Sequence, residues 1–159
     1  GFKTQDTIVL IMVVNITAAI GAFFFGYLQD KFGSVRCIMI TLLIWSAAIV
    51  CAYYATDSML FWIAANLIGI ALGGAQSAGR ALVGKLTPLG RQGEFFGLWG
   101  LATKLSAIIG PITYGGMVYW FEGDHRIALL STLGFFISGF VLMATVNEER
   151  GRKKAEIFS

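Results

Sequence analysis

The chain has 159 residues, and its composition excludes an ordinary water-soluble domain. Hydrophobic residues make up 57% of it and charged residues only 13%, whereas soluble domains carry roughly 25% charged residues. One small core cannot hide so much apolar side chain, because small domains keep much of their surface in water. An aromatic content of 14% also excludes a disordered chain. The lipid bilayer is the remaining solvent, and a net charge of +3 does not indicate nucleic acid binding.

Five apolar stretches follow one another between clusters of charge. Each is close to or above the roughly 20 residues that a membrane-spanning helix needs. The predicted spans are residues 7–29, 37–56, 58–82, 95–120 and 127–147. We therefore expect an all-α integral membrane protein, with five transmembrane helices in a single domain over residues 1–159.

Lys and Arg residues gather in alternate connections, which is the pattern of cytoplasmic loops. They are Lys31, Arg36, Arg80, Lys85, Arg91, Arg150, Arg152, Lys153 and Lys154. On the other side stand Lys3 and Arg126. The N-terminus is therefore expected outside the cell or in a lumen, and the C-terminus in the cytoplasm.

The first basic turn has the sequence Gly26-Tyr27-Leu28-Gln29-Asp30-Lys31-Phe32-Gly33-Ser34-Val35-Arg36. Gly26 allows two helices to approach closely, and Gly33 permits a tight turn. Asp30 can face a helix N-terminus, or pair with Lys31, Arg36 or a neighbouring helix. A solvated turn whose charges only set the topology is the alternative, and it suits Lys31 taken alone. The full pattern resembles the loop signature of the major facilitator superfamily, which implies that Asp30 and Arg36 form a cytoplasmic gate.

The span over 58–82 combines small residues with a polar end. Small residues recur every four positions on one helix face: Ala65, Gly69, Gly73 and Ser77. Such a face indicates close helix packing in lipid. The polar residues Asn66, Gln76 and Arg80 line a pathway or bond to neighbouring helices. For Arg80 the alternative is a side chain that extends to the membrane surface.

Lys104 is the one charged residue within the span over 95–120. Measured from Glu94, it lies about 15 Å into a hydrocarbon core about 30 Å thick. A lysine there costs roughly 2.5–3.5 kcal/mol on insertion scales, so it should face the bundle interior and an anionic partner. No predicted span contains Asp or Glu. A substrate carboxylate or a residue outside this chain is therefore expected as the partner, and backbone carbonyls are the alternative.

The residues that follow Lys104 complete the candidate pathway. Ser106 is expected to line it, and Gly110-Pro111 to kink the helix, because proline removes a backbone hydrogen bond. The sequence holds no Ser/His/Asp set, CxxC pair, phosphate loop or HExxH motif. We therefore expect no enzyme, no cofactor and no metal site.

Several segments together resemble the vacuole-effluxer-like branch of the superfamily, which includes autophagy-related amino-acid effluxers and their prokaryotic relatives. They are Gly73–Arg80, Pro88–Arg91, Glu94–Gly97, Lys104, Ser106 and Gly110-Pro111. The resemblance implies that the spans correspond to helices eight to twelve of a twelve-helix transporter. It implies that the chain is the C-terminal part of a larger protein and works with a missing N-terminal half, or with a second copy.

The function implied by the resemblance is secondary transport of small solutes, with amino-acid efflux by alternating access. The membrane is then the plasma or inner membrane of a prokaryote, or the vacuolar membrane of a fungus. The alternative is a half-size membrane protein that does not transport and instead assembles with or regulates another protein. The size of the native gene product distinguishes the two.

Overall fold

The structure is a computed structural model that describes residues 4–157, and six helices account for most of them. They are α1 (Thr4–Phe32), α2 (Ser34–Tyr54), α3 (Ser58–Leu86), α4 (Gln92–Trp120), α5 (His125–Ala144) and α6 (Glu148–Ile157). The first five are long and apolar enough to cross a membrane. The prediction of an all-α membrane protein with five spanning helices is confirmed.

The helices run beyond the apolar stretches at several ends. The third continues to Leu86 and the fourth begins at Gln92, whereas the predicted spans stop at residue 82 and start at residue 95. The length of an apolar stretch indicates how much of the chain lies in lipid. A helix, however, continues into the polar residues beyond it for as long as the backbone hydrogen bonds continue. The short helix α6 falls in the charged tail, where no helix was predicted.

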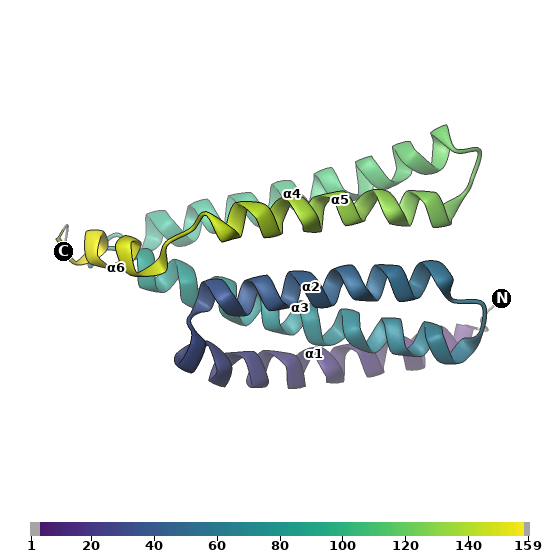
Figure 1. Ribbon diagram of the computed structural model, residues 1–159, viewed down its shortest axis with the longest axis horizontal. Helices are drawn as coiled ribbons and strands as arrows, with labels where there is room; N and C mark the ends of the chain where they lie inside the picture. The colour runs from purple at the N-terminus through teal and green to yellow at the C-terminus, as the bar shows by residue number, and fades with distance from the viewer. Residues whose placement is uncertain (1–3, 158–159) are drawn as a thin grey trace.

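The long helices lie alongside one another in two groups (Figure 1). Helices α1, α2 and α3 form one bundle, and α4 and α5 form a hairpin that approaches the bundle through α2 and α3. The short α6 lies at the end of the molecule opposite the N-terminus, against α3. We call this the α6 end.

Glycines allow α1 and α3 to pack backbone to backbone. A Cβ atom at Gly73 would collide with the carbonyl of Ala18, and one at Gly69 would collide with the side chain of Thr17. A Cβ at Gly21 on α1 would meet the backbone of Ile70 in the same way. In lipid, where apolar burial drives little association, such close packing is a main source of helix affinity. The predicted packing role of the small face on α3 is therefore confirmed.

The core lies inside this bundle, toward the α6 end. Phe25, Cys37 and Ala78 come from α1, α2 and α3 and are buried against one another. Helix α4, by contrast, has no buried residue among those described. The face of α4 that carries the candidate pathway residues is therefore open.

Candidate functional site

The turn between α1 and α2 depends on Gly33, as the sequence predicts. Gly33 has φ 88° and ψ 154°, a conformation that is essentially restricted to glycine. Its amide donates to the carbonyl of Gln29 at 3.0 Å, which ends α1, and α2 begins at the next residue. The side chain of Ser34 is fully buried where α2 starts.

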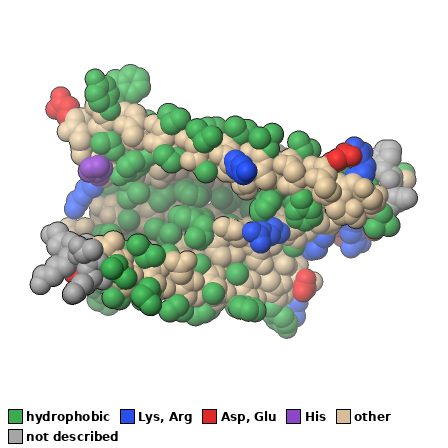
Figure 2. All heavy atoms as spheres, turned by 180° about the vertical axis from the view of Figure 1, so that it is seen from behind, with side chains coloured by type: hydrophobic (Ala, Val, Ile, Leu, Met, Phe, Trp, Pro, Cys, Tyr) green, Lys and Arg blue, Asp and Glu red, His purple; other side chains and the backbone are tan. Residues whose placement is uncertain are grey.

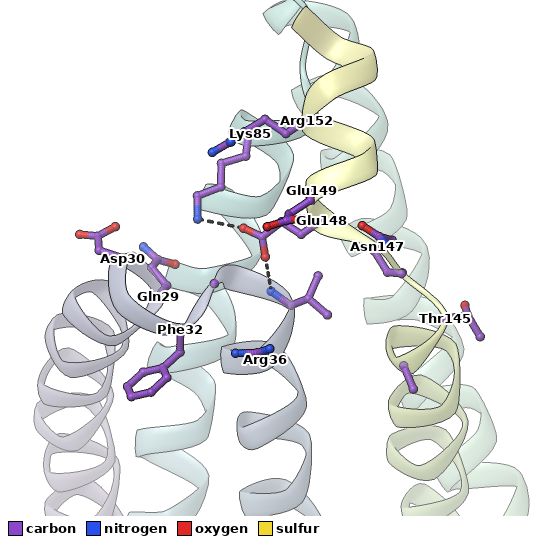
Figure 3. Close-up of a pocket in the computed structure, with 14 residues that line it drawn as sticks. Gln29, Asp30, Phe32, Arg36, Lys85, Thr145, Asn147, Glu148, Glu149 and Arg152 are labelled. Atoms are coloured by element: carbon purple, nitrogen blue, oxygen red, sulfur yellow. Dashed lines mark hydrogen bonds and ion pairs between the residues drawn. The ribbon is translucent and has the colours of Figure 1, made fainter.

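Glu148, the first residue of α6, connects this turn to the end of α3. Its Oε2 accepts from the backbone N–H of Val35 at 3.0 Å, and its Oε1 lies 3.0 Å from Lys85 Nζ (Figure 3). A carboxylate at the N-terminus of α2 satisfies an amide that the helix leaves free and interacts favourably with the helix dipole. One side chain thus fastens α2, α3 and α6 together.

The electrostatic surroundings of Glu148 favour its charged form. Burial by itself raises the pKa of this carboxyl, but the backbone N–H groups of Val35 and Ser34 and the Lys85 ammonium outweigh burial. The net pKa lies below the ordinary value of 4.5. Glu148 is therefore ionised at neutral pH and holds its partners as a charged acceptor.

Sequence patterns did not single out Glu148, although a local signal was present. Asn147 Oδ1 accepts from the backbone N–H of Arg150 at 2.9 Å, so Asn147 acts as the N-cap of α6. Glu148 and Glu149 follow in the first turn, where acidic residues are favourable. A capping residue followed by two acids predicts a helix start, but it does not predict what Glu148 contacts.

A cavity of about 750 Å³ surrounds this network and brings most of the predicted gate residues to one place. Its lining includes Asp30, Gly33 and Arg36 with Lys85, Glu148 and Arg152. Asp30 lies at the end of α1 and Arg36 in the first turn of α2, and the two side chains lie apart in Figure 3. Neither forms an ion pair with any residue of the described range 4–157. The gating role of Asp30 and Arg36 stays a prediction.

The other two predicted residues of the gate loop lie beside the cavity rather than in it. A Cβ at Gly26 would lie 3.5 Å from Ser77 Oγ, so Gly26 extends the close packing of α1 on α3. Lys31 Nζ lies 5.7 Å from the centre of the Tyr27 ring, one turn back on the same helix. This contact suits the alternative interpretation of Lys31 as a solvated charge.

Arg80 on α3 contacts α4. Its guanidinium carbon lies 5.5 Å from the centre of the Trp99 ring, a cation–π arrangement. A Cβ at the neighbouring Gly79 would lie 3.7 Å from Trp99 Nε1, so the absence of a side chain there gives the indole room. This contact with α4 does not fit the alternative prediction, in which the Arg80 side chain extends only to the membrane surface.

Lys104 and Gln76 are exposed, and neither has a hydrogen bond or ion pair with another described residue. Lys104 lies near the middle of α4, about 18 Å along the helix from Gln92. Figure 2 shows one face of the molecule, which is hollowed between the two groups of helices. The structure does not bring Lys104 and Gln76 into contact with each other.

The remaining predicted pathway residues make local contacts. Asn66 Nδ2 donates to the carbonyl of Trp62 at 2.8 Å, and Ser106 Oγ donates to that of Ala102 at 2.9 Å. Ser106, Gly110 and Pro111 line a cavity of about 800 Å³ between α4 and α5. Helix α4 continues through Pro111.

Comparisons with known proteins agree with this architecture. Residues 1–156 match the family described as "Vacuole effluxer Atg22 like". An uncharacterized MFS-type transporter, YxiO of Bacillus subtilis, is 28% identical over 94% of this chain and 35% of its own length. Autophagy-related protein 22 of Eremothecium gossypii is 25% identical over 97% of this chain and 32% of its own length. The niacin transporter NiaP of Acinetobacter baylyi is 32% identical over 63% of this chain and 24% of its own length.

The five long apolar helices define an α-helical integral membrane protein. The chain belongs to the vacuole effluxer Atg22-like family. It spans about a third of the length of the first curated relatives that it matches. No solved structure gives a significant match.

Proposed function

We propose that this chain forms part of a secondary transporter of the major facilitator type, which exports small solutes, amino acids among them, by alternating access. The observation that carries the proposal is the exposure of Lys104 near the middle of α4 without a partner among the described residues. A lysine exposed to hydrocarbon costs roughly 2.5–3.5 kcal/mol. The face of α4 that carries Lys104 must therefore contact protein or water rather than lipid. A solute pathway between two halves of a transporter provides both, because the second half packs against this face and the pathway holds water.

In this proposal, the polar residues have different roles according to their position along the pathway. Lys104 binds the carboxylate of the solute, and Asn66 and Ser106 lie in the apolar part of the route. Gln76 and Arg80 lie nearer the α6 end, where Arg80 is held against Trp99. Asp30 and Arg36 act at the gate beside the cavity of about 750 Å³. The rest of the pathway would come from an N-terminal half, or from a second copy of the chain.

The proposed topology places the α6 end in the cytoplasm. Lys and Arg side chains gather at this end in Figure 2, and cytoplasmic loops carry the excess of such residues. Arg126 lies in the first turn of α5, at the opposite end. A prokaryotic plasma membrane or a fungal vacuolar membrane both suit this orientation.

The test is efflux of radiolabelled amino acids from vesicles that contain the intact protein. Lys104→Ala should abolish efflux while the amount of protein in the membrane stays at the wild-type level. Lys104→Arg, which keeps the charge, should retain part of the rate, and Arg126→Ala at the opposite end is the matched control. Efflux by Lys104→Ala at the wild-type rate would contradict the assignment.

The open face of α4 also suits a protein that assembles with or regulates another membrane protein. The mass of the native gene product separates this candidate from the transporter. An antibody against Glu148–Ser159 should detect a band well above 17.2 kDa if the chain belongs to a full transporter. A native band at 17.2 kDa, together with no transport, supports the assembly partner instead.

A further inference from the structure

Helix α6 has an inner face that packs on α3 and on the turn before α2. Glu148 bonds to Lys85 and Val35, as described above. Gly151, one turn further, lies against the side chain of Leu86, and Ala155 is 7% exposed. These three residues share one side of the helix. At about 100° per residue, the positions three and seven residues after Glu148 return to nearly the same side of the helix axis.

The outer face of α6 is basic. It carries Arg150, Lys153, Lys154 and Ile157. A shallow hollow of about 340 Å³ lies there, lined by these four residues with Asn147 and Glu149. The three cationic side chains form no ion pair with any residue between 4 and 157. The hollow thus offers three free cations and a single carboxylate.

The other acidic residues of α6 do not neutralise this face. Glu148 is directed to Lys85 on the inner face. Glu156 Oε1 lies 3.6 Å from Arg152 Nε, in a pair on the flank of the helix. The positive charge of α6 is therefore concentrated on the side that faces away from the protein.

The position of α6 places this charge next to a membrane surface. Only residues 145–147 separate it from the end of the apolar helix α5, and it lies at the end of the molecule in Figure 1. A helix of this length extends about 15 Å, and the headgroup layer of one leaflet is roughly 5–8 Å thick. Long Lys and Arg side chains can reach back toward that layer.

We propose that the outer face of α6 binds the headgroups of anionic phospholipids in the adjacent leaflet. Basic segments directly beside a spanning helix are attracted to negatively charged lipid surfaces. The hollow places Arg150, Lys153 and Lys154 around one space, which suits a phosphate-bearing headgroup better than three scattered charges would. Such binding fixes α6 at the membrane surface while its inner face holds α2 and α3.

The test uses the intact protein in bilayers of phosphatidylcholine and phosphatidylglycerol in equal parts, with a spin label on one lipid at a time. The relative association constant of phosphatidylglycerol over phosphatidylcholine is read from the motionally restricted spectrum. Wild-type protein should prefer phosphatidylglycerol, and Arg150→Gln/Lys153→Gln/Lys154→Gln should lower that preference by roughly fivefold for each cation that contacts a headgroup. Added chloride salt should weaken the wild-type preference.

The matched control removes three cations from the same end but not from the outer face, as Lys31→Gln/Arg91→Gln/Arg152→Gln. This control should keep the wild-type preference, which separates the site from a general effect of net charge. An unchanged preference in the triple variant of α6 would overturn the proposal. So would loss of the wild-type preference in phosphate buffer but not in chloride buffer of equal ionic strength, because the face would then bind free phosphate.

Discussion

Glu148 Oε1 lies 3.0 Å from Lys85 Nζ, an ion pair between the first residue of α6 and the last turn of α3. The second oxygen of the same carboxylate caps α2 through Val35. Helices α2, α3 and α6 therefore share one acceptor, although Glu148 lies 113 positions from Val35 and 63 from Lys85 in the sequence. Because both partners are partly shielded from water, this pair is worth more than a fully exposed one.

Glu148→Gln should destabilise the protein by about 1–3 kcal/mol. The amide keeps the shape but removes the charge and one of the two acceptors, because its NH2 group can only donate. Either Val35 or Lys85 therefore loses its bond to this side chain, and Lys85 loses its counter-ion. The measurement is thermal unfolding in detergent. Glu149→Gln is the matched control, because Glu149 is an exposed neighbour with no ion pair in the described part of the chain. Equal unfolding midpoints for the two variants would refute the role of Glu148.

The stability that Glu148 contributes should depend on pH. Its pKa in the folded protein lies below the ordinary value of 4.5, so the contribution is complete above that value. It is lost as the pH falls from there through the lower folded pKa. Unfolding midpoints measured across this acidic range should therefore fall more steeply for the wild type than for Glu148→Gln. Parallel curves for the two proteins would contradict the assignment.

The five long helices could be predicted from the apolar stretches of the sequence alone. In lipid the backbone must satisfy its own hydrogen bonds, so a long apolar stretch has few structures available to it other than a helix. Helix α6 could not be predicted in this way, because it is short and charged. Its position depends on the contacts of Glu148 and Gly151 with α3 and α2 and on the burial of Ala155.

The sequence predicted the candidate site in part. A turn at Gly33 and a polar residue in the middle of α4 follow from local patterns, and both are present. The bond between Glu148 and Val35 joins residues 113 positions apart, and nothing local indicates which helix end lies beside which. An Asp30–Arg36 ion pair is one of several arrangements that the sequence allows, and the two side chains form none within residues 4–157.

Gly33→Ala should destabilise the turn by about 1–3 kcal/mol. The φ of 88° with ψ of 154° is a strained region for any residue with a Cβ. The added Cβ would also lie 3.0 Å from Glu148 Oε2 and so press on the capping carboxylate. Thermal unfolding measures the effect. In Gly33→Ala/Glu148→Gln the two losses should be less than additive, because both act on the same contact. Full additivity would mean that Gly33 and Glu148 act independently.

Gly73→Ala should separate α1 from α3. The new Cβ would collide with the backbone carbonyl of Ala18, which cannot rotate away as a side chain would, so the helices must move apart at a cost of about 1–3 kcal/mol. Gly115→Ala on α4 is the matched control, since no atom lies within 4 Å of its added Cβ and alanine is the better helix former. Thermal unfolding in detergent measures the cost. A lower unfolding midpoint in Gly73→Ala, with no fall in Gly115→Ala, is expected; equal midpoints for the two variants would show that α1 and α3 do not depend on this contact.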